Sequence, residues 1–195
     1  MTDQPHDPFS LFQHLFDQAR RSEPEDPEAM ALATADAQGR PSVRMVLLKG
    51  VDQGGFVFYT NTDSRKGQDL AANPFAALCI HWKSMRRQIR CEGRIERVSD
   101  ADADAYFASR PRESRIGAWA SQQSRPLKSR LALEKAVARY GLKFGLGEVP
   151  RPPYWGGYRL MPDRIEFWTA GAFRLHDRLV YTRADGQWTT VKLYP

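Results

Sequence analysis

Short strand-like runs separated by turn residues make up most of this chain, and they restrict it to a fold built on a sheet. Each run is rich in apolar, β-branched or aromatic residues, and Gln38-Gly39, residues 52–55 and Asp185-Gly186 read as turns between them. The runs span residues 30–35, 42–51, 56–61, 75–82, 88–98, 158–160, 164–169, 174–182 and 188–193. Their grouping favours an antiparallel meander and an α+β barrel over a parallel, doubly wound sheet.

Helical spacing appears in four places outside these runs. Asp7 and Pro8 suit the cap and first turn of a helix over residues 8–20, in which Phe9, Phe12 and Leu15 follow a helical repeat. A loop is expected at residues 21–27 and disorder at residues 1–6. Further helices are expected at residues 64–72, 100–109 and 127–144. The predicted class is therefore α+β, mainly β, with peripheral helices around a single domain over residues 7–195.

Charge is divided unevenly along the 195 residues. Residues 1–30 hold seven acidic and two basic side chains, whereas residues 31–195 hold 16 acidic and 27 basic ones, a net charge of +11. Of the 29 basic residues 22 are arginine, whose planar fork suits phosphate and carboxylate, so an anionic partner is expected. The two cysteines form no disulfide framework, and no apolar stretch is long enough for a membrane span. We therefore expect a soluble, cytoplasmic protein without a membrane partner.

The segment 173–178, Phe-Arg-Leu-His-Asp-Arg, concentrates cationic and hydrogen-bonding groups. If it is a strand, Arg174, His176 and Arg178 point to one face, and the preceding Ile-Glu-Phe-Trp run ending at Trp168 supplies an aromatic wall. This pattern predicts a flat, anionic ligand. The alternative is a solvated strand face whose arginines pair with carboxylates such as Asp177.

Cations and hydroxyls also gather at two earlier places. Arg44 and Lys49 lie on an apolar run, on opposite faces if the alternation is strict, and need either a ligand or a structural ion pair. At the second place a strand ends and a helix begins, and the free backbone N–H groups, hydroxyls and cations there suit a phosphate monoester. The alternative is an ordinary helix start with Ser64 as its N-cap. The residues of that second place are Tyr59, Thr60, Ser64, Arg65 and Lys66.

Tyr106, Arg110 and Ser114 follow a helical spacing of four until Pro111 interrupts it, which brings two hydroxyls and a guanidinium near one corner. A second phosphate would fit there. The alternative is a cluster in which Arg112 pairs with Glu113 in solvent.

The sequence lacks the motifs of nucleophilic catalysis, of phosphate binding by a glycine-rich loop and of metal binding. There is no glycine-rich phosphate loop and no Gly-x-Ser-x-Gly elbow, and Cys79 with His81 lacks the further ligands that a metal needs. No metal is expected. Any redox chemistry must therefore come from a bound cofactor.

Eight short motifs, taken in order, resemble the pyridoxamine 5'-phosphate oxidase family from about Asp7 to Pro195. They are Arg-Met-Val-Leu-Leu-Lys, Phe-Tyr-Thr-Asn, Ser-Arg-Lys, Arg-Gln, Tyr-Phe-Ala-Ser-Arg-Pro, Gln-Ser, Glu-Phe-Trp and Arg-Leu-His-Asp-Arg. The resemblance implies a split β-barrel homodimer with FMN at two sites between subunits. It also implies oxidation of pyridoxamine or pyridoxine 5'-phosphate to pyridoxal 5'-phosphate, with dioxygen as electron acceptor and hydrogen peroxide as product.

The same resemblance implies roles for individual residues. FMN contacts are implied for Arg44, Lys49, Tyr59, Thr60, Ser64, Arg65 and Lys66 of one subunit and for Gln88, Gln123, Ser124, Trp168 and Arg178 of the other. The substrate phosphate is implied to bind Lys49, Tyr106, Arg110 and Ser114. Arg174 and His176 are implied to act over the pyridine ring as the catalytic pair. Two positions depart from the family pattern, Thr169 where Gln is common and Lys192 where Arg is general, which bears on the C-terminal anchoring because lysine cannot form a bidentate fork.

Three alternatives remain open at this stage. The same fold and cofactor could serve another substrate, such as a phenazine precursor, although Tyr106, Arg110 and Ser114 would then lack a phosphate. The basic body with interleaved aromatics could form a nucleic-acid-binding barrel, which the oxidase hypothesis excludes. A flavin or pyridoxal phosphate carrier without turnover is the third.

Overall fold

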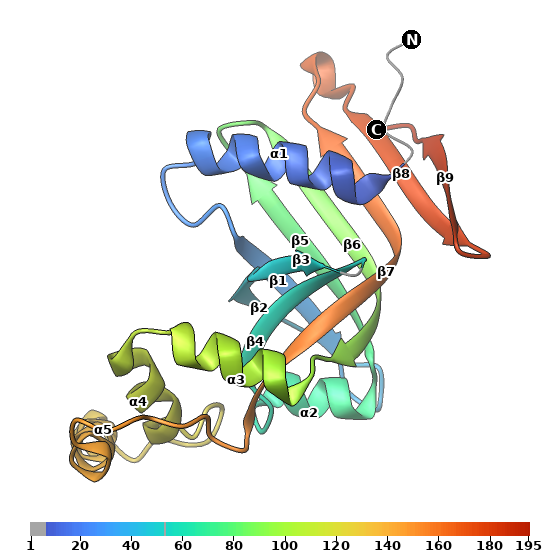
Figure 1. The fold of residues 1–195 in the computed structure, drawn as a ribbon. Helices are drawn as coiled ribbons and strands as arrows, with labels where there is room; N and C mark the ends of the chain where they lie inside the picture. The colour runs from blue at the N-terminus through green and yellow to red at the C-terminus, as the bar shows by residue number, and fades with distance from the viewer. Residues whose placement is uncertain (1–6, 53) are drawn as a thin grey trace.

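One curled antiparallel sheet dominates the structure, and the helices lie outside it (Figure 1). The computed structural model describes residues 7–52 and 54–195, and the expectation of disorder at residues 1–6 falls outside this range. The helices are α1 (Pro8–Ser22), α2 (Arg65–Ala72), α3 (Asp100–Ser109), α4 (Arg112–Ala120), α5 (Arg130–Phe144) and the 3₁₀ turn η1 (Ala172–Arg174). The strands are β1 (Ala29–Ala35), β2 (Pro41–Leu47), β3 (Gly50–Asp52), β4 (Gly55–Asn61), β5 (Phe75–Trp82), β6 (Arg87–Arg97), β7 (Trp155–Thr169), β8 (Asp177–Ala184) and β9 (Gln187–Lys192).

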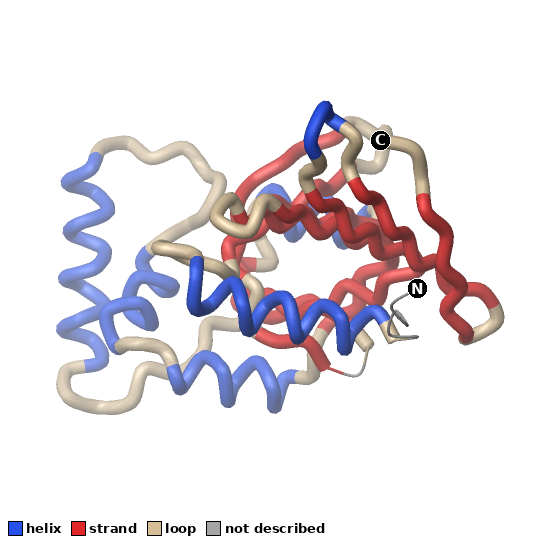
Figure 2. The backbone as a smooth tube through the Cα atoms, turned by 90° about the horizontal axis from the view of Figure 1, so that it is seen from above, coloured by secondary structure: helices blue, strands red, loops and turns tan. Residues whose placement is uncertain are grey.

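The strands run in the order β2-β1-β5-β6-β7-β4-β3, and β8 and β9 extend the sheet from the far part of β7. Every pairing is antiparallel. Seen from above, the strands curl around a common interior with α1 beside it (Figure 2). The predicted mainly β split barrel is confirmed. None of the described helices is long and apolar enough to cross a membrane.

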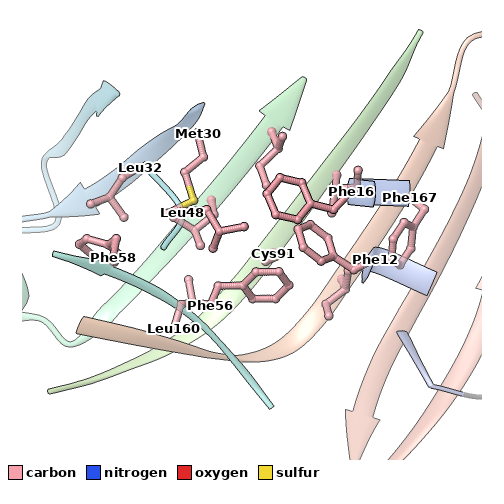
Figure 3. Close-up of a cluster of buried hydrophobic side chains, with 14 of the residues drawn as sticks. Phe12, Phe16, Met30, Leu32, Leu48, Phe56, Phe58, Cys91, Leu160 and Phe167 are labelled. Atoms are coloured by element: carbon pink, nitrogen blue, oxygen red, sulfur yellow. The ribbon is translucent and has the colours of Figure 1, made fainter. Parts of the chain in front are cut away.

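The core fills the concave side of the sheet, and α1 closes it (Figures 1 and 3). Phe12 is fully buried, with its ring 4.9 Å from that of Phe56 and 6.0 Å from that of Trp82. Burial of an aromatic side chain of this kind contributes about 1.5–3 kcal/mol. Asp7 caps the helix by accepting the backbone N–H groups of Phe9 and Ser10, as the sequence predicts.

Several expected boundaries are wrong. The run 42–51 is two strands, because the chain leaves β2 after Leu47 and enters β3 at Gly50, so the meander does not continue from β2 into β4. The runs 158–160 and 164–169 are one strand, β7, in which the register slips past Asp163 at a β-bulge next to Pro162. Helix α4 is not expected from the sequence, and the helix predicted at 127–144 begins only at Arg130.

The expected strand 174–182 is also wrong at its start. Residues 172–174 form η1, and Phe173 and Arg174 have positive φ angles of 53° and 63°, which a strand cannot contain. The tight turn needs Gly171, because a Cβ there would overlap the carbonyl oxygen of Leu175. Strand β8 begins at Asp177, so Arg174, His176 and Arg178 do not share one strand face.

Candidate functional site

Lys66 is a buried amine held entirely by neutral groups. Its Nζ donates to Thr60 Oγ1 at 3.1 Å, to Ser64 Oγ at 3.2 Å and to Gln123 Oε1 at 2.8 Å. Burial, and then the nearby charge of Arg44, lower the pKa of Lys66 from 10.5 to about 8. We call Thr60, Ser64, Lys66 and Gln123 the Lys66 cluster.

Arg44 lies next to this cluster and has an internal carboxylate partner. Its guanidinium donates to Thr34 Oγ1 at 2.7 Å and lies 3.6 Å from Asp69 Oδ2, and Thr34 in turn donates to Asp69 at 2.7 Å. The charge of Arg65 also acts on Arg44. Arg44 is thus close enough to both Arg65 and Lys66 for their charges to interact, while only Arg44 is paired with a carboxylate, Asp69. An anion would offset the surplus positive charge.

An aromatic stack stands beside the Lys66 cluster. The ring of Tyr59 stacks on that of Tyr106 with centroids 4.1 Å apart and on that of Trp155 at 5.4 Å. Gly157 makes this possible, because a Cβ at that position would lie 2.6 Å from the Tyr59 ring. The guanidinium carbon of Arg110 lies 5.0 Å from the centroid of Trp155, a cation–π contact that fixes its position.

A cavity of about 280 Å³ opens between this stack and the Lys66 cluster. It is lined by Tyr59, Thr60, Asn61, Arg110, Ser114, Gly117, Ala118, Ser121, Gln123 and Trp155. Nη1 of Arg110 is buried and has no hydrogen-bond partner among the described residues. Burial lowers the pKa of Arg110, although the guanidinium stays charged at neutral pH. A buried, unpartnered cationic donor in a cavity fits a ligand phosphate, since leaving such a donor unpaired costs about 1–3 kcal/mol or more.

Ser124 lies on a second, larger cavity of about 630 Å³ that continues from Gln123 toward α5. The resemblance assigned Gln123 and Ser124 to the opposite subunit from Lys66. In the structure the loop after α4 folds back and brings the Gln123 side chain against Lys66 of the same chain, and the subunit from which Gln123 contacts FMN stays a prediction.

A second group of expected site residues lies around Trp168. Gln88, Trp168 and Arg178 are directly opposite one another across β6, β7 and β8, so their side chains share one face. The ring of His176 lies 4.6 Å from that of Trp168. The backbone N–H of Gly171 donates to His176 Nδ1 at 3.2 Å, which leaves the proton of a neutral imidazole on Nε2. We call Gln88, Trp168, His176 and Arg178 the Trp168 cluster.

Three further residues have no side-chain contact with either cluster among the described residues, although the backbone oxygen of Arg174 accepts from the N–H of His176 at 2.9 Å. Arg174 is exposed on η1. Lys49 Nζ lies 3.9 Å from Glu28, a loose and partly exposed ion pair. Lys192 is paired with Asp177 at 3.0 Å on the surface, so the C-terminal hairpin keeps a charged anchor where the family pattern has arginine.

The two clusters lie at opposite ends of β7. Trp155 begins this strand beside Arg110, and Trp168 lies one residue before its end. At about 3.3 Å per residue the strand separates them by roughly 40 Å along its path. One small ligand cannot touch both ends in a single copy of the chain. A site that uses both clusters needs a second copy.

Some residues that shape the site give little signal in the sequence. Asp69 looks like an ordinary exposed helix residue but is buried beneath Arg44. Trp155 follows a proline-rich segment that reads as a loop. Glu166 sits in an apolar run, where a buried carboxylate can be suspected because it requires a partner; it is 1% exposed and accepts from Arg178 Nε at 2.7 Å.

Together these features define a split-barrel protein with a candidate site that is rich in cationic and aromatic side chains. Family models match almost the whole chain: "Pyridoxamine 5'-phosphate oxidase" over residues 16–144 and "Pyridoxine 5'-phosphate oxidase C-terminal dimerisation region" over residues 155–195. The pyridoxine/pyridoxamine 5'-phosphate oxidase of Caulobacter vibrioides is 62% identical over 189 residues, covering 97% of this chain and 85% of the relative. The chain belongs to the pyridoxamine 5'-phosphate oxidase family, a family of enzymes.

Solved structures agree with the fold. PhzG from Burkholderia lata, solved in complex with tetrahydrophenazine-1-carboxylic acid, superposes with a TM-score of 0.92 at 35% identity, covering 99% of this chain and 95% of that one. A pyridoxamine 5'-phosphate oxidase-related, FMN-binding protein from Nostoc punctiforme gives a TM-score of 0.77 at 20% identity, covering both chains fully. The latter likeness concerns the fold alone.

Proposed function

We propose that this protein is an FMN-dependent oxidase that converts pyridoxamine or pyridoxine 5'-phosphate to pyridoxal 5'-phosphate, with dioxygen as electron acceptor and hydrogen peroxide as product. The observation that carries the proposal is the buried, unpartnered Nη1 of Arg110 beside the aromatic stack. The names of the relatives at about 60% identity support the same substrate class. FMN, when bound, supplies an acceptor for a hydride that dioxygen can later remove.

The chain's own residues bind and orient in this proposal. The surplus positive charge around Lys66 suits the FMN phosphate, and Arg110 with Ser114 suits the substrate phosphate. The FMN-binding set is Arg44, Lys49, Tyr59, Thr60, Ser64, Arg65, Lys66, Gln88, Gln123, Ser124, Trp168 and Arg178. The substrate-binding set is Lys49, Tyr106, Arg110, Ser114, Arg174 and His176. Anchoring the phosphate leaves the pyridine ring of the substrate only a small choice of orientations, which lowers the entropic cost of reaction.

Arg174 and His176 are the proposed catalytic residues. The Gly171 N–H holds His176 with its Nε2–H free to donate, so the imidazole can stabilise charge at the substrate oxygen or nitrogen. Arg174 is exposed in the single chain. In the proposed dimer, the partner subunit holds the ligand against η1, where the Arg174 guanidinium can contact the substrate.

We propose a homodimer with FMN between subunits. The separation of the two clusters along β7 supports it, and so does the matched dimerisation region at residues 155–195. The outward face of β2 adds a physical reason, because Val43, Met45 and Leu47 are 68%, 64% and 40% exposed on neighbouring positions of one strand face. Exposed apolar strips of this kind mark interfaces.

Aerobic turnover tests the proposal. FMN-loaded protein is given pyridoxamine 5'-phosphate, and aldehyde and peroxide are followed together. We expect the two products in equal amounts, and far less product from pyridoxamine without its phosphate. FMN-loaded protein that yields neither product would reject the proposal and favour a carrier.

One observation favours a second candidate. The structural likeness to PhzG, solved with a tricyclic acid, supports an oxidase of the same fold that acts on a reduced phenazine. The lower identity of 35% and the phosphate-compatible cavity weigh against it. Oxidation of dihydrophenazine-type compounds in preference to pyridoxamine 5'-phosphate would make this candidate the better one.

A further inference from the structure

Glu166 is the most deeply buried carboxylate of a charged network on the outward face of β6, β7 and β8. Its side chain is 1% exposed, and three arginines surround it. Arg178 Nε donates to Oε1 at 2.7 Å, Arg164 lies 3.3 Å from Oε2 and Arg90 lies 3.6 Å from the same oxygen. Burial opposes the ionisation of Glu166, but the hydrogen bond and charge of Arg178, helped by Arg90 and Arg164, hold its pKa below the usual range. The carboxylate is therefore charged at neutral pH.

Strand register explains why these groups meet. Arg90 is directly opposite Glu166 on one side, and Val180 on the other. Arg178 lies two residues before Val180 on β8, opposite Trp168, and its guanidinium extends along the sheet to Glu166. The contact with Glu166 therefore restricts the orientation of Arg178, which belongs to the Trp168 cluster.

The guanidinium of Arg178 is held at two points and open at a third. Its Nε is occupied by Glu166, and its Nη1 donates to the backbone oxygen of Tyr194 at 3.1 Å. Its Nη2 has no hydrogen bond within the part of the chain that the structure describes. A planar guanidinium with two donors occupied can present the third in one direction only.

We propose that Glu166 is a positioning residue, which orients Arg178 so that its open Nη2 edge serves the FMN bound at the subunit interface. The inference rests on the proposed function, and it deepens that function by assigning a role to a residue that itself touches no ligand. Without the carboxylate, Arg178 can adopt other rotamers. FMN binding must then restrict this side chain to one rotamer, and the entropy lost in doing so weakens the affinity.

Glu92 provides a matched control. It belongs to the same network, with Arg90 at 2.9 Å and Arg164 at 3.2 Å, but it makes no contact with Arg178. Glu92→Gln removes the same charge from the same face and leaves the Arg178 contact intact. A general effect of charge would appear in both variants, whereas a positioning effect would appear only at Glu166.

The test is FMN affinity, measured by titrating the apoprotein with FMN and following flavin fluorescence. We expect Glu166→Gln to raise the Kd about tenfold, the loss expected for a charge-assisted hydrogen bond, and Glu92→Gln to change it less than about twofold. In an Arg178→Ala background, Glu166→Gln should cause no further loss, because the residue through which it acts is gone.

Each other outcome is decisive. Unchanged affinity in Glu166→Gln, or an equal loss with and without Arg178, would overturn the inference while leaving the oxidase intact. A wild-type chain that does not bind FMN would overturn the proposed function and the inference together. If Glu166→Gln does not fold, Glu166→Asp decides, since it keeps the charge but cannot reach Arg178 in the same geometry; wild-type affinity there would also reject the role.

Discussion

Trp155 and Trp168 lie near opposite ends of the same strand, β7, and each stands in a different half of the candidate site. Trp155 carries Arg110 against its ring, at the edge of the smaller cavity. Trp168 contacts His176 and is directly opposite Arg178. The proposed ligand contacts therefore fall into two groups at opposite ends of one strand, which is the reason for proposing that two copies of the chain share each site.

FMN affinity should fall as the pH rises above about 8. Burial, followed by Arg44, lowers the pKa of Lys66 to about 8, whereas the second phosphate pKa is about 6 and does not titrate in this range. Below pH 8 the ammonium form is ready to bind the anion; above it, binding must first take up a proton, so affinity should fall by up to about tenfold per pH unit. Fluorescence titrations between pH 7 and 9.5 measure this slope. Lys66→Arg stays charged and should flatten it, and an equal slope in that variant would show that Lys66 is not the titrating group.

Arg110→Met should weaken substrate binding without weakening the fold. The substitution removes a buried donor that has no partner in the unliganded chain and keeps an unbranched side chain over Trp155. We expect an unchanged or higher melting temperature and a KM for pyridoxamine 5'-phosphate about 10- to 100-fold higher.

Arg112→Met is the control for that change. Arg112 donates to the backbone oxygen of Gly147 at 2.7 Å and so ties α4 to the end of α5, away from the cavity. The Arg112→Met substitution should lower the melting temperature and leave the KM for pyridoxamine 5'-phosphate near the wild-type value. The reverse pattern in the two variants would contradict the assignment of Arg110 to the substrate phosphate.

Phe12→Ala should destabilise the whole protein, because the Phe12 ring fills the space between α1 and the sheet (Figure 3). We expect the free energy of unfolding in urea to fall by about 3–5 kcal/mol. Leu142→Ala on α5 is the comparison, since that side chain is 84% exposed and should cost little. A small loss at Phe12 would mean that α1 is not part of the cooperative core.

Met45→Glu should prevent self-association. Met45 lies in the middle of the exposed apolar strip of β2, and a charge buried at an interface without a partner is costly. We expect monomers in sedimentation experiments, together with loss of bound FMN. Leu146→Glu places the same charge at a fully exposed position outside this strip and should remain a dimer. A dimeric Met45→Glu protein that retains FMN would place the interface elsewhere.

Periodicity predicted much of the fold because apolar alternation and turn residues are local signals. It separated most strands correctly, including 75–82 with both ends. It failed where the decisive contact is distant: Pro162 reads as a strand end, but a bulge lets β7 continue past it. Helix α4 was not predicted, since it follows Pro111 and its short length gives little repeat. The turn at η1 depends on positive φ angles at Phe173 and Arg174, residues that do not favour them.

The sequence indicated which residue types belong to the candidate site, but not how these residues are arranged in space. Motif order, through the family resemblance, indicated which residues to group, and the structure brings Thr60, Ser64 and Lys66 together. The place of Gln123 could not be foreseen, because it depends on how the loop after α4 folds back. The partners of Arg44 and Arg178 could not be identified from the sequence. Asp69 reaches Arg44 from helix α2 through the packing of that helix on the sheet, and Glu166 meets Arg178 through the register of β7 and β8.

Complementation between two variants of low activity tests whether two copies of the chain share each site. At substrate and FMN concentrations well below the raised KM and Kd, the Arg110→Met and Arg178→Ala homodimers are each expected to be nearly inactive. When the two are unfolded together and refolded as a mixture, each mixed dimer should contain one site with Arg110 and Arg178 both intact and one site with both lost. We expect FMN-dependent oxidation of pyridoxamine 5'-phosphate at about half of the wild-type rate per mixed dimer, as two-fold symmetry requires. Mixed dimers that form but remain as inactive as their parents would contradict a site shared between two copies of the chain.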